Sequence, residues 1–346
     1  MRAHLEILSC GPAVTVQDMG RIGYLAQGLT RGGAADTLAL FEGAALLGQS
    51  PQLACLEMGG MGGQFRATGD TRIALTGAPM IASIDGIPLA WNASHMLPAG
   101  ADLQIGGTRG GTYGYLHVGG GLNTPEMMGA RGTHLGAGLG KALEAGSTLP
   151  LGADSATKTG MTLDVQNRFD GGPIRIIPSM QTDQFDAATR ARFTTTIFRR
   201  DTRANRMGVR MDHDSTPFMA ADQLSILSDV IVPGDIQIAG DGAPFVLMCE
   251  CQTTGGYPRI GTVLPCDMPR VAQAPAGAAI TFDLIDVQTA RAAEHREAAL
   301  RNALPTMVKP LLRNPYDIRD LLSYQLISGA ISATSDPFSQ EDNTCE

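Results

Sequence analysis

Apolar and polar residues alternate along several short stretches of the chain, and a turn signal precedes each stretch. Glycine at such a turn allows a positive φ, and apolar residues two positions apart then face one side of a sheet. The pattern predicts strands around the apolar pairs Leu103/Ile105, Leu149/Leu151, Ile236/Ile238 and Ile280/Phe282. Two pairs lie in the first half of the chain and two in the second, which indicates two β-rich halves.

Helical patterns are few. Asp36 is placed to cap a helix over residues 37–47, and Gly48 is placed to end it. A short helix is also expected over residues 183–192. Many short strands with few helices favour a mainly β fold.

The strongest helical pattern follows the last predicted strand. Residues 287–304 are rich in alanine, and Pro305 is expected to stop this helix. Asn314 and Pro315 resemble the cap and first turn of a second tail helix that runs to about residue 327. The polar residues from 332 onward are expected to be frayed.

These patterns predict three regions. We expect an N-terminal β lobe over residues 1–165, a C-terminal β lobe over 166–285, and a tail over 286–346 that is helical and then disordered. The stretch 152–172 is the expected linker between the lobes, because it is poor in apolar residues early and ends in a glycine pair.

Composition narrows the class of protein. The net charge is −8 and the basic residues are scattered, so nucleic acid is not an expected partner. No apolar run approaches the roughly 18 to 20 residues that a membrane helix needs. The six cysteines form no C-x-x-C pair, and free thiols in a reducing compartment indicate a cytoplasmic protein.

Three familiar motifs are nearly present and are rejected. Residues 136–141 resemble a P-loop, but the first glycine is out of register and Ala142 replaces the magnesium-binding hydroxyl. Residues 117–121 resemble an oxyanion-hole loop, but the chain has no G-x-S-x-G nucleophile motif. The six histidines are dispersed, so no metal site is expected.

The first polar stretch of interest places Gln17, Asp18 and Arg21 within five residues, beside glycines that let a backbone approach a ligand. An arginine at such a position is able to clamp a planar carboxylate or ureido group with two hydrogen bonds. A salt-bridged β-turn is the structural alternative, and the residues alone leave both interpretations open.

The second polar stretch follows the apolar run of residues 245–248, which predicts a buried strand. Gln252, Thr253 and Thr254 precede two glycines, and Tyr257 is held by a following proline. Three consecutive hydrogen-bonding side chains are more than a plain hairpin turn requires. This segment is therefore predicted to be a binding loop at a strand end.

Taken in order, these pieces resemble the biotin-dependent carboxyltransferase family, also called allophanate hydrolase subunit two. The family includes the C subunit of 5-oxoprolinase, the KipA protein and the carboxyltransferase part of urea carboxylase (urea amidolyase). The resemblance covers roughly residues 5 to 285. It rests on Gln17-Asp18 with Gly20-Arg21, Asp36, Glu57, residues 75–78, Gly119-Gly120, residues 206–208, residues 234–237, residues 252–258, Asp267 and Gln273.

The resemblance implies two cyclophilin-like β-barrel lobes and a partner protein that is KipI-like, or like the B subunit of 5-oxoprolinase. It implies a subunit of a multi-chain enzyme that hydrolyses an amide or lactam such as 5-oxoproline with ATP. ATP would be bound on another chain, since ATP binding is implied at the family level only. No cofactor is expected to be covalently bound here.

Two other functions remain open at this point. One is carboxyl transfer from biotin to urea or a related amide. Biotin would then arrive on a partner chain, because the three lysines lie in no carrier motif. The other is a non-catalytic regulator that binds a KipI-like partner.

The chain also departs from the family pattern. It has Ala44 and Gln49 where the family has asparagines, and residues 111–116 lack the usual arginine. Residues 129–133 lack two serine hydroxyls, and Glu250 replaces an aspartate. The chain is therefore predicted to be a divergent member.

Site roles follow from the resemblance and the residue chemistry. Asp18 is the predicted base or orienting carboxylate, and Arg21 and Arg131 are the predicted anion clamps. The predicted substrate-binding residues are Gln17, Gln237, Glu250, Gln252, Thr253, Thr254, Gly255, Gly256 and Tyr257. In this hypothesis the early turn and the later loop wall one shared cavity.

Overall fold

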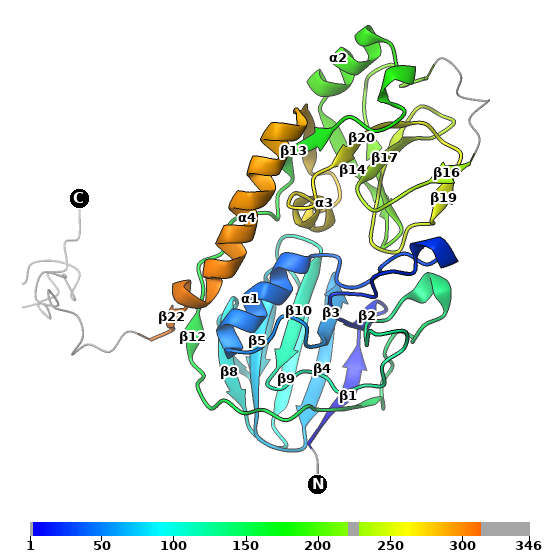
Figure 1. Cartoon of the computed structure of the whole chain (residues 1–346). Coiled ribbons are helices and arrows are strands. Elements are labelled where there is room, and N and C mark those ends of the chain that lie inside the picture. The colour runs from blue at the N-terminus through cyan, green and yellow to red at the C-terminus, as the bar shows by residue number, and fades with distance from the viewer. Residues whose placement is uncertain (1–2, 221–227, 313–346) are drawn as a thin grey trace, which may run out of the picture. The chain divides into compact units, whose positions relative to one another are not determined.

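The computed structural model describes residues 3–220 and 228–312. The described residues up to Leu311 belong to one unit, in which the strands fall into two groups (Figure 1). The prediction of a mainly β fold is confirmed. The second tail helix predicted from Asn314 lies outside the described residues, as do the polar residues from 332 onward.

The N-terminal lobe contains two sheets. The six-stranded sheet has the order β11 (Thr148–Pro150), β1 (His4–Cys10), β4 (Met61–Ala67), β9 (Asp102–Thr108), β6 (Met80–Ile84) and β7 (Ile87–Pro88). The seven-stranded sheet has the order β2 (Val14–Gln17), β3 (Cys55–Gly59), β10 (Tyr113–Val118), β5 (Thr71–Gly77), β8 (Ala93–Leu97), β12 (Met161–Thr162) and β22 (Lys309–Pro310). Buried side chains from both sheets, such as Leu5, Phe65, Leu75 and Leu116, form one core. The lobe is thus a pair of packed sheets, whereas a barrel was expected.

The second group of strands forms a closed barrel. Its order is β13 (Gly172–Ile177), β20 (Arg259–Val263), β17 (Asp235–Ile238), β18 (Pro244–Leu247), β15 (Gly208–Asp212), β14 (Phe198–Ala204) and β21 (Ala279–Leu284). Phe193, Phe198, Phe218 and Phe282 pack against one another in its core, with ring centroids 5.0 to 5.7 Å apart. The predicted strands around Ile236/Ile238 and Ile280/Phe282 are both in this barrel.

Capping residues set the ends of the first two helices. In α1 (Thr37–Leu47) the carboxylate of Asp36 accepts a hydrogen bond from Ala39 N, and Gly48 ends the helix in the left-handed conformation. Asp36 and Gly48 therefore have their predicted roles. The helix expected over 183–192 is instead a 3₁₀ turn followed by α2 (Ala187–Thr195), because Asp186 is the N-cap residue.

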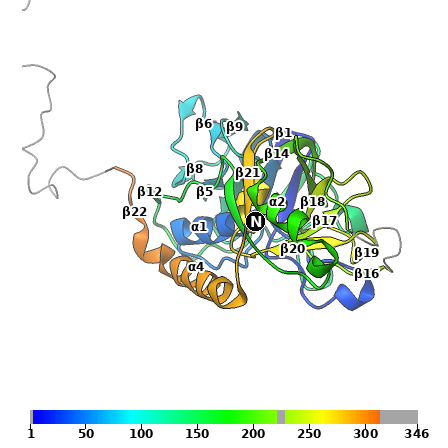
Figure 2. The ribbon, with the colours of Figure 1, turned by 90° about the horizontal axis from the view of Figure 1, so that it is seen from above.

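The long helix α4 (Val287–Met307) lies alongside α1, as Figure 1 and Figure 2 both show. The guanidinium of Arg301 in α4 lies 5.7 Å from the ring centroid of Phe41 in α1. Pro305 lies inside α4, so the prediction that it stops the helix is wrong. A proline in the last turn removes one backbone hydrogen bond, and the helix continues for only two more residues.

The two lobes meet through a mixed apolar and polar junction. One hydrophobic cluster contains both N-terminal residues, such as Leu40 and Tyr115, and barrel residues. Arg206 of the barrel forms ion pairs with Glu57 of β3 and with Glu250. The hydroxyl of Tyr115 donates to the same Glu57 carboxylate at 2.7 Å.

A second polar connection runs through α3 (Met268–Gln273). The side-chain oxygen of Gln273 accepts hydrogen bonds from the backbone N–H groups of Thr112 and Tyr113, and its nitrogen donates to Asp36. Buried polar groups need such partners, and these come from the opposite lobe. Glu57, Asp36, Arg206 and Gln273, which carried part of the family resemblance, therefore hold the lobes together.

Candidate functional site

The outer face of the barrel presents a row of side chains across three strands. Arg210 of β15 lies opposite Phe245 of β18, and Phe245 lies opposite Gln237 of β17. Their neighbours along each strand, such as Ile236 and Ile238, point into the core, so these three side chains point outward. Directly opposed residues on neighbouring strands share a face, and the row therefore forms one surface.

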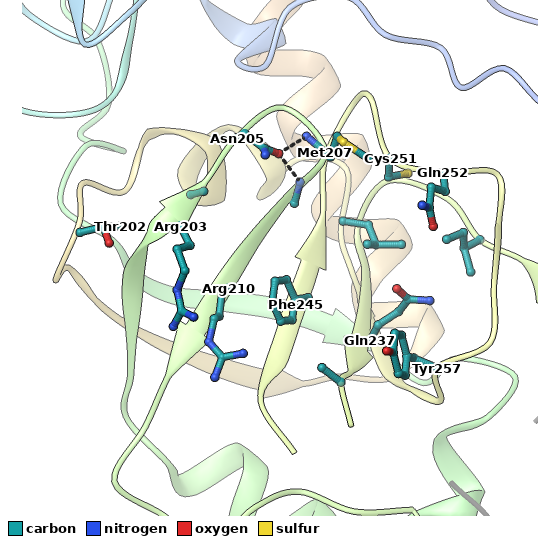
Figure 3. A pocket seen from close by; sticks show the side chains of 15 residues that line it. Thr202, Arg203, Asn205, Met207, Arg210, Gln237, Phe245, Cys251, Gln252 and Tyr257 are labelled. Atoms are coloured by element: carbon teal, nitrogen blue, oxygen red, sulfur yellow. Dashed lines mark hydrogen bonds between the residues drawn. The ribbon is translucent and has the colours of Figure 1, made fainter. Parts of the chain in front are cut away.

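A cavity of about 700 Å³ lies over this row. Figure 3 shows Phe245 at its centre, with Arg203 and Arg210 on one side and Gln237 and Tyr257 on the other. Cys251, Gln252 and Tyr257 come from the segment after β18 and contribute to its lining. The cavity therefore combines a rigid strand surface with a loop wall.

Gln237 is the buried polar group of this cavity. It is 8% exposed, and its amide nitrogen has no hydrogen-bond partner among the described residues. A buried donor without a partner costs free energy, roughly 1–3 kcal/mol, unless a ligand or water satisfies it. A Cβ at Gly255 would lie 2.5 Å from this nitrogen, so the glycine of the loop leaves the space that the amide occupies.

The two arginines of the cavity are held by carboxylates. Arg210 pairs with Asp241 at 2.8 Å and with Asp212 at 3.3 Å, and its guanidinium lies 5.4 Å from the centroid of Phe245. Hydrogen bonds from Arg203 hold the pKa of Asp201 below its ordinary value. These pairs fix the arginines and balance the positive charge on this side of the cavity.

Cys251 is the thiol in the cavity wall. Burial raises its pKa to about 12, so the thiol stays protonated at neutral pH. Since the thiolate is the reactive form, Cys251 is not set up as a nucleophile. The uncharged polar side chains of the lining are those of Thr202, Asn205, Gln237, Gln252 and Tyr257.

The early turn lies outside this cavity. Asp18 is 6% exposed, and its carboxylate accepts hydrogen bonds from Gly20 N at 2.8 Å and Arg131 N at 2.6 Å. Arg21 is 1% exposed and donates to the carbonyl oxygens of Met127 and Gly132. Among the described residues Arg21 forms no ion pair, so this turn is not salt-bridged. Both side chains hold backbone from residues more than one hundred positions away.

The remaining members of the turn cluster are Gln17, whose buried side-chain oxygen has no partner among the described residues, and Arg131. Gln17 is fully buried and donates to Thr15 and to the carbonyl of Thr133. The guanidinium of Arg131 donates to the carbonyl of Thr124 and pairs with Glu126 at 3.2 Å. No residue of the 17–21 turn lines this cavity, so the expectation that the turn and the loop wall one shared cavity stays a prediction.

The predicted substrate-binding residues are placed differently by the structure. Gln237, Gln252 and Tyr257 line the cavity. Thr254 and Gly255 form the short strand β19 (Thr254–Gly255), which pairs with β16 (Asp229–Val230), and Ile231 N donates to the carbonyl of Thr253. Glu250 is buried and pairs with Arg206, and neither Glu250 nor Gly256 is part of the cavity lining.

The family is decided by a sequence comparison. The model of the carboxyltransferase domain, subdomain A and B, matches residues 27–284. The chain belongs to this family. The predicted resemblance is thereby confirmed, and the matched residues include the whole cavity lining but neither the 17–21 turn nor α4.

Individual relatives agree with this assignment. The C subunit of 5-oxoprolinase from Escherichia coli (strain K12) is 33% identical over an alignment of 288 positions that covers 80% of this chain and 90% of that protein. The urea amidolyase of Lachancea kluyveri is 24% identical over an alignment of 348 positions that covers 90% of this chain but only 19% of that protein. This carboxyltransferase-domain chain therefore corresponds to nearly all of one relative and to a small part of the other.

The fold is shared with a solved structure. The crystal structure of the Kluyveromyces lactis urea carboxylase matches with a TM-score of 0.77 and 21% identity, over 91% of this chain and 31% of that chain. At this identity the match supports the fold alone.

The described residues add two further observations. They contain no group of three or more His, Cys, Asp or Glu side chains arranged to hold a metal ion. No helix in the described ranges combines the length and the apolar character needed to cross a membrane.

The sequence interpretation missed part of the cavity. Arg203, Arg210 and Phe245 were not predicted as site residues, and residues 245–248 were treated only as a buried strand. The alternation Val209-Arg210-Met211 and Phe245-Val246 was the available signal, because it places Arg210 and Phe245 on the face opposite to the core.

Proposed function

We propose that this chain is a subunit of a 5-oxoprolinase-like enzyme and that the barrel cavity binds the amide group of its substrate. The unpartnered, buried amide nitrogen of Gln237 carries the proposal. The similarity to the C subunit of 5-oxoprolinase over 90% of that protein supports it. The proposal includes three expectations from the sequence: the chain is part of a hydrolase, it acts in the cytoplasm, and its partner is like KipI or the B subunit of 5-oxoprolinase.

The chemistry of Gln237 suits a lactam. A lactam has its N–H and its carbonyl on the same side of the ring, so it offers one donor and one acceptor to a side-chain carboxamide. The Gln237 nitrogen would donate to the lactam carbonyl, and its oxygen would accept from the ring N–H. Phe245 and Tyr257 would contact the flat faces of the ring.

Amide cleavage needs activation, because resonance makes the carbonyl carbon a poor electrophile. In this proposal ATP bound on a partner chain supplies that activation, and this chain binds and orients the amide. A biotin ureido ring delivered on a partner chain has the same donor and acceptor pattern, and is distinguished by the test below. The catalytic roles of Asp18, Arg21 and Arg131 stay predictions: Asp18 and Arg131 bind backbone and neighbouring groups, and Arg21 binds backbone through Nε and Nη2 while its buried Nη1 has no partner among the described residues.

The test is an activity assay on the complex reconstituted with its partner subunits. Hydrolysis of ATP that depends on 5-oxoproline is measured for the wild type, for Gln237→Leu and for the matched control Gln104→Leu, an exposed glutamine of β9. Loss of one ligand hydrogen bond is expected to raise KM about tenfold in Gln237→Leu and to leave Gln104→Leu unchanged.

Three results would overturn the proposal. Equal KM values for Gln237→Leu and the wild type would remove the cavity from the substrate site. Activity that depends on biotin and not on 5-oxoproline would favour carboxyl transfer. Tight binding of the partner without turnover would favour a regulatory protein.

A further inference from the structure

A line of hydrogen bonds crosses from the N-terminal lobe to the cavity wall. The hydroxyl of Thr30 lies 3.0 Å from His134 Nε2 and donates to the backbone carbonyl of Cys251 at 3.0 Å. Thr30 is 2% exposed and His134 is 4% exposed, so water does not compete for these bonds. Thr30 and His134 belong to one lobe and Cys251 to the other.

The geometry fixes the direction of each bond. The backbone N–H of Ala137 donates to His134 Nδ1 at 3.2 Å, so this nitrogen must be the acceptor of the ring. The ring proton is then on Nε2, which donates to Thr30 Oγ1. The hydrogen of Thr30 is thereby free to reach the carbonyl of Cys251. Thr30 Oγ1 therefore accepts from His134 Nε2 and donates to the carbonyl of Cys251.

Two neighbouring bonds hold the same segment. Gly32 N donates to the carbonyl of Cys249 at 3.0 Å, and Gly136 N donates to the Glu250 carboxylate at 3.3 Å. Residues 249–251 connect β18 to the loop that carries Gln252 and Tyr257, and Cys251 itself lines the cavity. The N-terminal lobe therefore contacts the base of the cavity loop at three successive residues.

We infer that Thr30 and His134 are positioning residues that hold the cavity loop of the barrel in its binding arrangement. Only the expected effect on substrate binding rests on the proposed function. The position of the loop itself is measurable without a substrate. Neither residue lines the cavity. Their effect on binding acts through the carbonyl of Cys251.

The chain contains a matched control for this inference. Thr76 Oγ1 lies 2.8 Å from His117 Nε2 and donates to the carbonyl of Ala39 at 3.0 Å. Thr76 is buried, as Thr30 is, but both of these partners lie in the N-terminal lobe. Thr76→Val removes the same chemical group without touching the cavity loop.

The experiment compares Thr30→Val, Thr30→Ser and Thr76→Val in the full chain. The first readout is the rate at which iodoacetamide alkylates Cys251, followed by peptide mass spectrometry. The second is the KM and kcat of the reconstituted complex for 5-oxoproline. Loss of one buried hydrogen bond raises the population of the open loop, so Thr30→Val is expected to alkylate at Cys251 about tenfold faster.

The same change is expected to raise KM severalfold with kcat unchanged, and Thr30→Ser is expected to restore both values. Thr76→Val is expected to lower stability without changing either readout. An equal increase in Thr30→Val and Thr76→Val, or no increase in Thr30→Val, would overturn the inference. If Thr30→Val exposes Cys251 while the wild type shows no activity on 5-oxoproline, the positioning role stands and the proposed function falls.

Discussion

The early turn and the later loop look alike in sequence and differ in structure. Both place amide, hydroxyl or charged side chains beside glycines. Arg21 of the turn is 1% exposed and bound to backbone, whereas Tyr257 of the loop is 49% exposed and lines a cavity. The difference comes from distant residues, because Met127 and Gly132 supply carbonyls to the turn while Tyr257 stays open to solvent. A polar cluster next to glycine therefore indicates either a ligand site or a buried joint.

The largest effect is expected when the turn loses its arginine. Arg21→Met removes the side-chain donor of the buried Gly132 carbonyl and one of the two donors to the partly buried Met127 carbonyl, so we expect the free energy of unfolding to fall by about 3 kcal/mol. Urea unfolding measures this change. The control is Arg66→Met on the surface, whose pair with Asp102 is partly exposed and is expected to contribute less than about 1 kcal/mol.

One result for Arg21→Met would contradict the distinction between a buried turn and a ligand-binding loop. Unchanged stability together with a loss of substrate turnover would make the turn a ligand site after all, as the sequence interpretation proposed.

The dependence of stability on pH gives an intermediate effect next to the turn. Burial lowers the pKa of His134 from its ordinary value, against the opposing charge of Glu250, so folding favours the neutral ring. As the pH falls below about 6.5 the unfolded chain binds a proton at this residue more readily than the folded protein does. Its contribution to stability is therefore present above that pH and is lost as the pH falls toward the lowered pKa.

His134→Gln keeps an N–H near the position of Nε2 without a titrating group. We expect the difference in unfolding free energy between about pH 7.5 and about pH 5.5, measured in urea, to be smaller in this variant than in the wild type. His117 is also held neutral, since burial lowers its pKa to about 3, and it is present in both proteins. A variant with the same pH dependence as the wild type would show that His134 does not titrate in this range.

The smallest effect on stability is expected in the loop. Tyr257→Ala removes a side chain that is half exposed, so the free energy of unfolding should change by less than about 0.5 kcal/mol. Binding of 5-oxoproline, measured by calorimetry on the reconstituted complex, is expected to weaken severalfold because one wall of the cavity is lost. A large loss of stability would mean that the loop, like the turn, is mainly structural.

Local signals predicted much of the fold. Asp36 and Gly48 bound α1 as expected, because capping depends on neighbouring residues alone. Alternation found β17 and β21 for the same reason. The prediction that Pro305 ends the helix was wrong, since a proline near a helix terminus costs only one bond there and the helix continues past it.

The site was less predictable, because its character depends on tertiary contacts. Gln237 was predicted as a donor, but only the folded barrel shows that its nitrogen is buried without a partner among the described residues. Asp18 was predicted as a base, but the backbone N–H of Arg131 comes from 113 positions away and occupies its carboxylate. The spacing of residues along the sequence does not reveal that two residues so far apart come into contact.

The pairing of β22 with β12 also determines how a protease could release the barrel from the rest of the chain. The polypeptide leaves the N-terminal lobe after β12, forms the barrel, and returns to the N-terminal lobe along α4. The barrel is therefore inserted within the N-terminal lobe and is joined to it by two chain segments. A single proteolytic cut between residues 163 and 171 leaves the barrel covalently joined to the N-terminal lobe through α4. Release of the barrel as a separate fragment therefore requires two cuts.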